Sequence, residues 1–120
     1  MNRNMDLVRK ILFEIEAQND TLSNKIVVEG YSENEIKYHL AIMNDAGFFE
    51  ATVAKISGSK YPLIVPSRLT WFGHDFLDAS RDENRWNQAK GVVKKLGSSV
   101  TFDVFKTILV QIMTSQIPKF

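Results

Sequence analysis

Histidine is the residue type with which this chain could do acid–base or metal chemistry, and it occurs twice. The chain has no cysteine, so a zinc site would need both His39 and His74 together with carboxylates. Neither histidine has a second histidine four residues away or an HExxH arrangement. Glycine-rich phosphate loops and nucleophile elbows are also missing from the sequence. We therefore expect a protein that is not an enzyme and that uses no cofactor and no metal.

The two histidines have simpler structural interpretations. His39 lies beside the apolar stripe of a predicted helix at 33–46, where we expect it to be hydrogen-bonded to a neighbouring element. His74 and Asp75 are adjacent on a second predicted helix, and adjacent helical positions point in different directions.

Another group of polar side chains could bind nucleic acid. Asn34, Lys37 and Tyr38 fall on the outward face of the helix at 33–46, where they could reach base edges and phosphates. Four further residues surround a predicted hairpin turn and could contact a phosphate backbone: Lys55, Ser57, Ser59 and Lys60. The alternatives are an amphipathic helix with a mixed polar face, and a hairpin tip that is polar only because water surrounds it.

The helix that would present these residues has clear start and stop signals. Ser32 and Glu35 have the spacing of a capping box, and Gly47 stands where a left-handed C-cap is wanted. Between them, apolar residues recur at helical spacing. A helix that runs through Ala-Gly into a strand of aromatic and β-branched residues is typical of the recognition helix and wing of a winged helix.

Two elements are predicted before this helix. The apolar spacing and the cap at Asn4 predict a helix over 5–18, and the turn formers at 19–24 predict a loop. The β-branched run at 25–29, ended by Gly30, predicts a short strand. A regular helix-turn-helix would have a supporting helix in this interval.

After the helix, the sequence predicts a β-hairpin. Residues 48–56 and 61–65 read as its two strands, joined by a turn that contains glycine. Pro62 and Pro66 cannot donate to a strand ladder, so they place the second strand at an edge or bound it. This hairpin is the candidate wing.

Two further helices should follow the hairpin. Thr70 is the expected cap of the first, and Trp71 should widen its buried aromatic face. Ser80 and Glu83 repeat the capping-box spacing, which predicts a new helix from about residue 81, and Gly97 should end it. Gly91 inside that helix marks a place where another element could approach closely.

The final helix is predicted over 102–116, with Thr101 as its cap. Its apolar face is broader than one small domain needs, which predicts a homodimer interface. The proposed interface residues are Phe105, Ile108, Leu109, Ile112 and Met113. The alternative is that this face covers the core of its own chain.

Composition bounds the fold class. The chain has 120 residues with 44% hydrophobic and 24% charged side chains, typical of one globular domain. We expect an α+β fold, mostly helical: a winged-helix-like part at 1–69 and additional C-terminal helices at 70–120.

The net charge of +1 creates no global attraction to nucleic acid or membrane. We expect a cytoplasmic protein, because the chain lacks cysteine, a signal peptide and an apolar run of about 20 residues.

Nearly the whole chain resembles the YjcQ-like family of uncharacterised proteins from phages, prophages and Gram-positive bacteria. The matching stretches are MDLVRKIL at 5–12, EGYSENEIKYHLAIMNDAGFFEA at 29–51, RLTWFGHDFLDASRDENRWNQAK at 68–90 and TFDVFKTIL at 101–109. The resemblance implies a winged-helix-like domain with additional C-terminal helices, and it brings no established activity or catalytic residue.

A looser resemblance is to winged-helix repressors. The residues that match their recognition helix and wing entry are Ser32, Ile36, His39, Leu40, Ala46 and Gly47. The missing support helix and the acidic residues Glu33 and Glu35 depart from that pattern.

Two functions are therefore open. The winged-helix pattern favours a DNA-binding transcription regulator of phage or prophage type, with double-stranded DNA as its partner. The near-zero net charge and the apolar last helix favour a protein–protein interaction module that docks on or inhibits a host protein.

Overall fold

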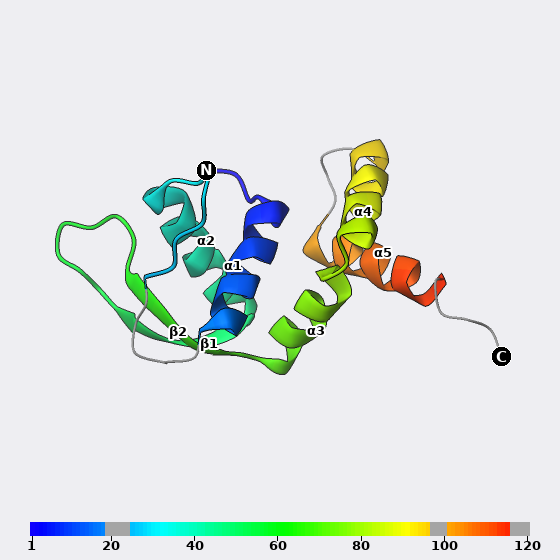
Figure 1. The fold of residues 1–120 in the computed structure, drawn as a ribbon. Coiled ribbons are helices and arrows are strands. Elements are labelled where there is room, and N and C mark those ends of the chain that lie inside the picture. Colours follow the sequence, from blue (N-terminus) through cyan, green and yellow to red (C-terminus); the bar gives the residue numbers. More distant parts are fainter. Residues whose placement is uncertain (19–24, 97–100, 116–120) are drawn as a thin grey trace. The chain divides into compact units, whose positions relative to one another are not determined.

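The computed structural model describes residues 1–18, 25–96 and 101–115, without the side chains of Phe102 and of 113–115 (Figure 1). Its helices and strands are α1 (Met5–Ala17), α2 (Glu33–Ala46), β1 (Phe49–Ala54), β2 (Leu63–Leu69), α3 (Trp71–Ser80), α4 (Glu83–Leu96) and α5 (Phe102–Ser115). The fold is α+β and mostly helical, as predicted, and it is consistent with a winged-helix-like arrangement. None of these helices is long and apolar enough to cross a membrane.

The chain divides into two compact units, Met1–His74 and Asp75–Phe120. The boundary falls within α3, a few residues after the position at which the sequence separates a winged-helix-like part from the C-terminal helices. In the first unit, α1 packs against α2 and β2. The second unit contains α4 and α5, which pack against each other.

Helix α2 has the start and the end that the sequence predicts. The Glu35 N–H donates to Ser32 Oγ, and the Ser32 N–H donates to Glu35 Oε1, both at 3.1 Å. Ile36 and Met43 are buried on its inner face. Gly47 ends the helix with a φ of +82°, a left-handed conformation that favours glycine.

The predicted strand at 25–29 is wrong. The sheet of the described residues contains only β1 and β2, and residues 25–28 pair with neither. Ile26 and Val28 are nevertheless buried while Val27 is 65% exposed. The side chains of this segment thus alternate between buried and exposed, as they would in a strand, although the segment pairs with neither β1 nor β2. The predicted loop at 19–24 lies outside the described residues.

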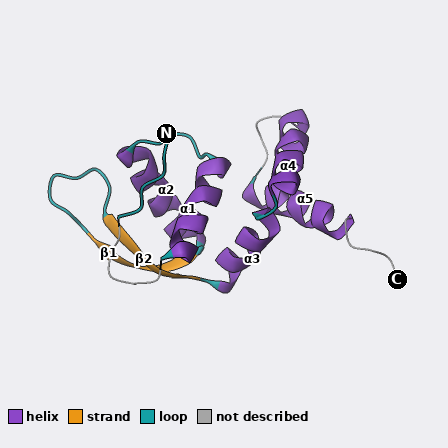
Figure 2. Cartoon of the chain, in the orientation of Figure 1, coloured by secondary structure: helices purple, strands orange, loops and turns teal. Residues whose placement is uncertain are grey.

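The β-hairpin forms, but its second strand is longer than predicted and Pro66 lies inside it (Figure 2). The strands are antiparallel from the Phe49–Leu69 pair to the Ala54–Leu63 pair. The register shifts between Glu50 and Ala51, so that Ser67 lies between residues paired with them. This bulge is next to Pro66, which has no N–H to donate to a ladder.

The start of α3 is fixed by a close approach to the end of α2. Thr70 caps the helix, since the Gly73 N–H donates to Thr70 Oγ1 at 3.1 Å. The Thr70 N–H donates to the carbonyl oxygen of Phe48 at 3.0 Å. A Cβ on Gly73 would overlap that same carbonyl oxygen. Trp71, predicted in a buried face, is instead 84% exposed.

Helix α4 begins differently from the prediction. Its cap is Asp82, whose Oδ1 accepts from the Arg85 N–H at 2.9 Å. Ser80 is buried and donates its hydroxyl to the Leu77 carbonyl at 3.0 Å, so it does not cap α4. None of the described residues has an atom within 4 Å of the position of a Cβ on Gly91, so they make no close approach of the kind predicted at this glycine. The predicted end of this helix at Gly97 lies outside the described residues.

Aromatic rings form the core of the second unit. The ring of Trp86 lies 6.2 Å from the ring of Phe76 and 5.0 Å from that of Phe105, measured between centroids. All three side chains are at most 4% exposed. Helix α5 begins after Thr101, whose Oγ1 accepts from the Val104 N–H at 3.4 Å.

Candidate functional site

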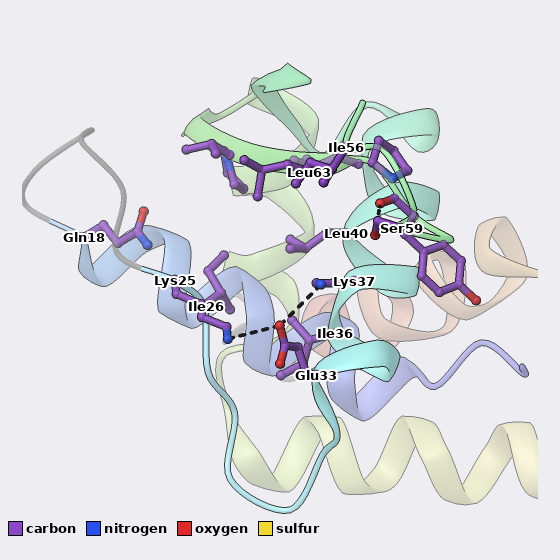
Figure 3. Close-up of a pocket in the computed structure, with 15 residues that line it drawn as sticks. Gln18, Lys25, Ile26, Glu33, Ile36, Lys37, Leu40, Ile56, Ser59 and Leu63 are labelled. Atoms are coloured by element: carbon purple, nitrogen blue, oxygen red, sulfur yellow. Dashed lines mark hydrogen bonds and ion pairs between the residues drawn. The ribbon is translucent and has the colours of Figure 1, made fainter. Parts of the chain in front are cut away.

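A pocket of about 330 Å³ lies in the first unit, between α2 and the β-hairpin (Figure 3). Helix α2 supplies Ile36 and Leu40, and β2 supplies Leu63 and Ile64. Ile26, from the extended segment before α2, completes the inner wall. Apolar side chains make up most of the lining, so the pocket could bury an apolar group of a ligand or partner.

The charged residues of the lining form an ion-pair cluster. One oxygen of Glu33, Oε1, lies 3.1 Å from Lys25 Nζ and 3.3 Å from Lys37 Nζ, as the dashed lines in Figure 3 show. Hydrogen bonds from Lys25 and then Lys37 hold the pKa of the Glu33 carboxyl below its ordinary value of 4.5. Among the described residues, two ammonium groups thus face one carboxylate on this side of the pocket.

The structure brings together residues that the sequence places on a recognition helix and on a wing. The ring of Tyr38 on α2 lies 6.0 Å from the ring of Tyr61 beside the hairpin loop. Ser59 donates its hydroxyl to the Tyr61 carbonyl at 2.8 Å, and Lys60 Nζ lies 5.5 Å from the Tyr61 ring centroid. Lys37 and Ser59 line the same pocket. Helix and hairpin loop therefore form one continuous surface.

The other predicted DNA-binding residues are less closely tied to this surface. Asn34 is exposed in the first turn of α2. Lys55 and Ser57 are exposed in the hairpin loop, and the pocket lining does not include them.

The apolar walls of the pocket are the part that the sequence prediction missed. Ile56 lies in the hairpin loop and Leu63 begins β2, and they are 49% and 44% exposed. Large apolar side chains on both sides of the polar tip at 57–60 are the signal that could have indicated this pocket.

His39 has a structural role, as predicted. Its side chain is 1% exposed. Its Nε2 accepts from the Asn4 N–H at 2.9 Å, and its Nδ1 lies 2.8 Å from the Glu35 carbonyl oxygen, to which it donates. The Nε2 bond thus joins the start of α1 to α2, and the Nδ1 bond lies within α2. No group of three or more His, Cys, Asp or Glu that could hold a metal occurs among residues 1–18, 25–96 and 101–115.

The apolar face predicted to form a homodimer is covered within the single chain. Phe105, Ile108, Leu109 and Ile112 are between 0% and 9% exposed, and the Phe105 ring packs on Trp86. These four residues therefore agree with the alternative interpretation, in which the face covers the core of its own chain. The side chain of Met113 lies outside the described part of the structure.

Comparison with known proteins places the chain in a family. The family model described as "Hypothetical protein (DUF2513)" matches residues 2–99. The chain belongs to the DUF2513 family. One relative of this DUF2513 protein is an uncharacterized protein of Haemophilus influenzae, 28% identical over 119 residues, which cover 98% of this chain and 99% of the relative. No solved structure matches the chain.

Proposed function

We propose that this DUF2513 protein binds double-stranded DNA through α2 and the hairpin loop, as a cytoplasmic transcription regulator of phage or prophage type. The contact between Tyr38 and Tyr61 carries the proposal, because it joins the helix and the loop into one surface. The resemblance of residues 32–50 to winged-helix repressors supports the same assignment. The family description and the relative's name add no activity.

In this proposal, α2 enters the major groove and the hairpin loop follows the phosphate backbone. Asn34, Lys37 and Tyr38 would contact bases and nearby phosphates. The residues that would contact phosphates from the loop are Lys55, Ser57, Ser59 and Lys60.

The Glu33 carboxylate opposes this binding, because it already pairs with Lys37 and would repel phosphates. We therefore expect weak binding that depends strongly on salt. The test is the fluorescence anisotropy of a labelled random duplex of about 30 base pairs at several salt concentrations. Log affinity should fall linearly with log salt.

Charge variants sharpen this test. Lys37→Ala should weaken binding similarly on all sequences and reduce the salt slope by about 1. Glu33→Gln should strengthen binding, because it removes the competing carboxylate. Lys94→Ala, which removes an exposed charge from α4, is the matched control and should leave both quantities unchanged. An absence of binding by the wild-type protein at low salt would refute the proposal.

A protein–protein interaction module is the second candidate function. The observation that favours it is the exposure of large apolar side chains in the first unit, with Val27 at 65% and Ile56 at 49%. A stoichiometric complex with a host protein, lost on Ile56→Asp and accompanied by flat DNA titrations, would support this function. Tight sequence-specific DNA binding without such a complex would exclude it.

A further inference from the structure

We infer that the pocket between α2 and the hairpin binds a small amphiphilic anion, with an aliphatic body and one carboxylate group. The inference does not rest on DNA binding, although Lys37 and Glu33 belong to both proposals, because a ligand titration tests it without DNA. Three features carry it: the size of the pocket, its apolar walls, and the balance of charge at Glu33.

The walls suit an aliphatic body. Ile36, Leu40 and Ile64 are between 5% and 8% exposed, so they form a packed floor. Leu63 and Ile56 are about half exposed and leave apolar surface open to water beside that floor. A ligand that covers these two side chains would remove apolar surface from water, which strengthens binding by about fourfold for each buried methylene. The volume of about 330 Å³ lies within the range of small-molecule pockets.

The charged side of the pocket selects an anion over a cation. Lys25 and Lys37 share the single carboxylate of Glu33. An incoming carboxylate can pair with one lysine while Glu33 keeps the other. An incoming ammonium group would instead be repelled by the two lysine ammonium groups that lie beside Glu33.

Lys37 is the lysine that should hold the ligand. Its side chain is 35% exposed, whereas that of Lys25 is 66% exposed. An ion pair at the less exposed lysine is less screened by water. Lys37 also lies one turn before Leu40 on α2, so its ammonium group can pair with a carboxylate at the mouth of the apolar pocket.

The experiment is a titration of the full chain with decanoate and decylamine below their micellar concentrations and with decanol below its solubility limit, followed by two-dimensional amide NMR. Decanoate should bind saturably, more tightly than decanol, with the largest shifts at Lys37, Leu40 and Leu63. Octanoate, two methylenes shorter, should bind about 15-fold more weakly. Equal or tighter binding of decylamine or decanol, or no saturable binding of decanoate, would overturn the inference.

Variants test where the ligand lies. Lys37→Met should weaken decanoate about threefold to fivefold and leave decanol unchanged. Glu33→Gln should strengthen decanoate, because it frees an ammonium group.

A matched pair in the hairpin tests the apolar wall. Leu63 lines the pocket at 44% exposed, whereas Val53 is 49% exposed on the facing strand and does not line it. Leu63→Asp should weaken decanoate by about tenfold or more, and Val53→Asp should change it less than about twofold. The amide spectrum of each free variant establishes that it is folded. Unchanged decanoate binding in folded Leu63→Asp would overturn the inference.

Discussion

His39 shows how a single side chain can join two helices. Its imidazole accepts from the Asn4 N–H and donates to the Glu35 carbonyl oxygen, and it is almost fully buried. Asn4 also caps α1 through its side chain, which accepts from the Leu7 N–H at 3.3 Å. The imidazole thus holds the capping residue of α1 against α2.

We expect His39→Leu to lower the free energy of unfolding by about 1–3 kcal/mol, because leucine leaves the Asn4 N–H without its acceptor. Urea denaturation followed by circular dichroism measures this change. His74→Leu is the control, since His74 is exposed, and it should change the free energy by less than about 0.5 kcal/mol. Similar losses in the two variants would contradict the structural role of His39.

At the scale of elements, two helical glycines have opposite surroundings. Gly73 in α3 lies against the carbonyl oxygen of Phe48, so an added methyl group has no room. Gly91 in α4 has open space at the same position.

Gly73→Ala should therefore destabilise the protein by about 1–3 kcal/mol, because the end of α2 and the start of α3 must move apart. Gly91→Ala should stabilise it by about 0.5–1 kcal/mol, because alanine favours the helix more than glycine does. Thermal unfolding of both variants provides the measurement. A stabilising Gly73→Ala would show that the contact with Phe48 is not tight in solution.

At the scale of the whole molecule, the burial of α5 bears on oligomeric state. Phe105, Ile108, Leu109 and Ile112 could reach a second copy only if they left the core that they now fill. We therefore expect a monomer of 13.7 kDa at high micromolar concentration. Light scattering coupled to gel filtration gives this mass. A dimeric mass, together with greater exposure of α5 when the dimer dissociates, would contradict this prediction. It would support the homodimer that the sequence predicts.

The sequence by itself determined the features that depend on local hydrogen bonds and spacing. The capping box of Ser32 and Glu35, the left-handed Gly47 and the cap at Thr70 involve groups a few residues apart, so residue types alone indicate them. Helical apolar stripes are equally local, which is why α1, α2 and α5 lie close to their predicted ranges. The structural role of His39 could also be expected from its place beside such a stripe.

Only the tertiary structure decided what depends on contacts between distant residues. Residues 25–29 have the composition of a strand but find no partner. Gly73 and Gly91 look alike in sequence, and only the position of the Phe48 carbonyl distinguishes them. The pocket likewise arises because Ile26, α2 and the hairpin meet in space, although they are separated in the chain. Local residue types do not specify which distant surfaces will pack together, so the candidate site became visible only in the folded molecule.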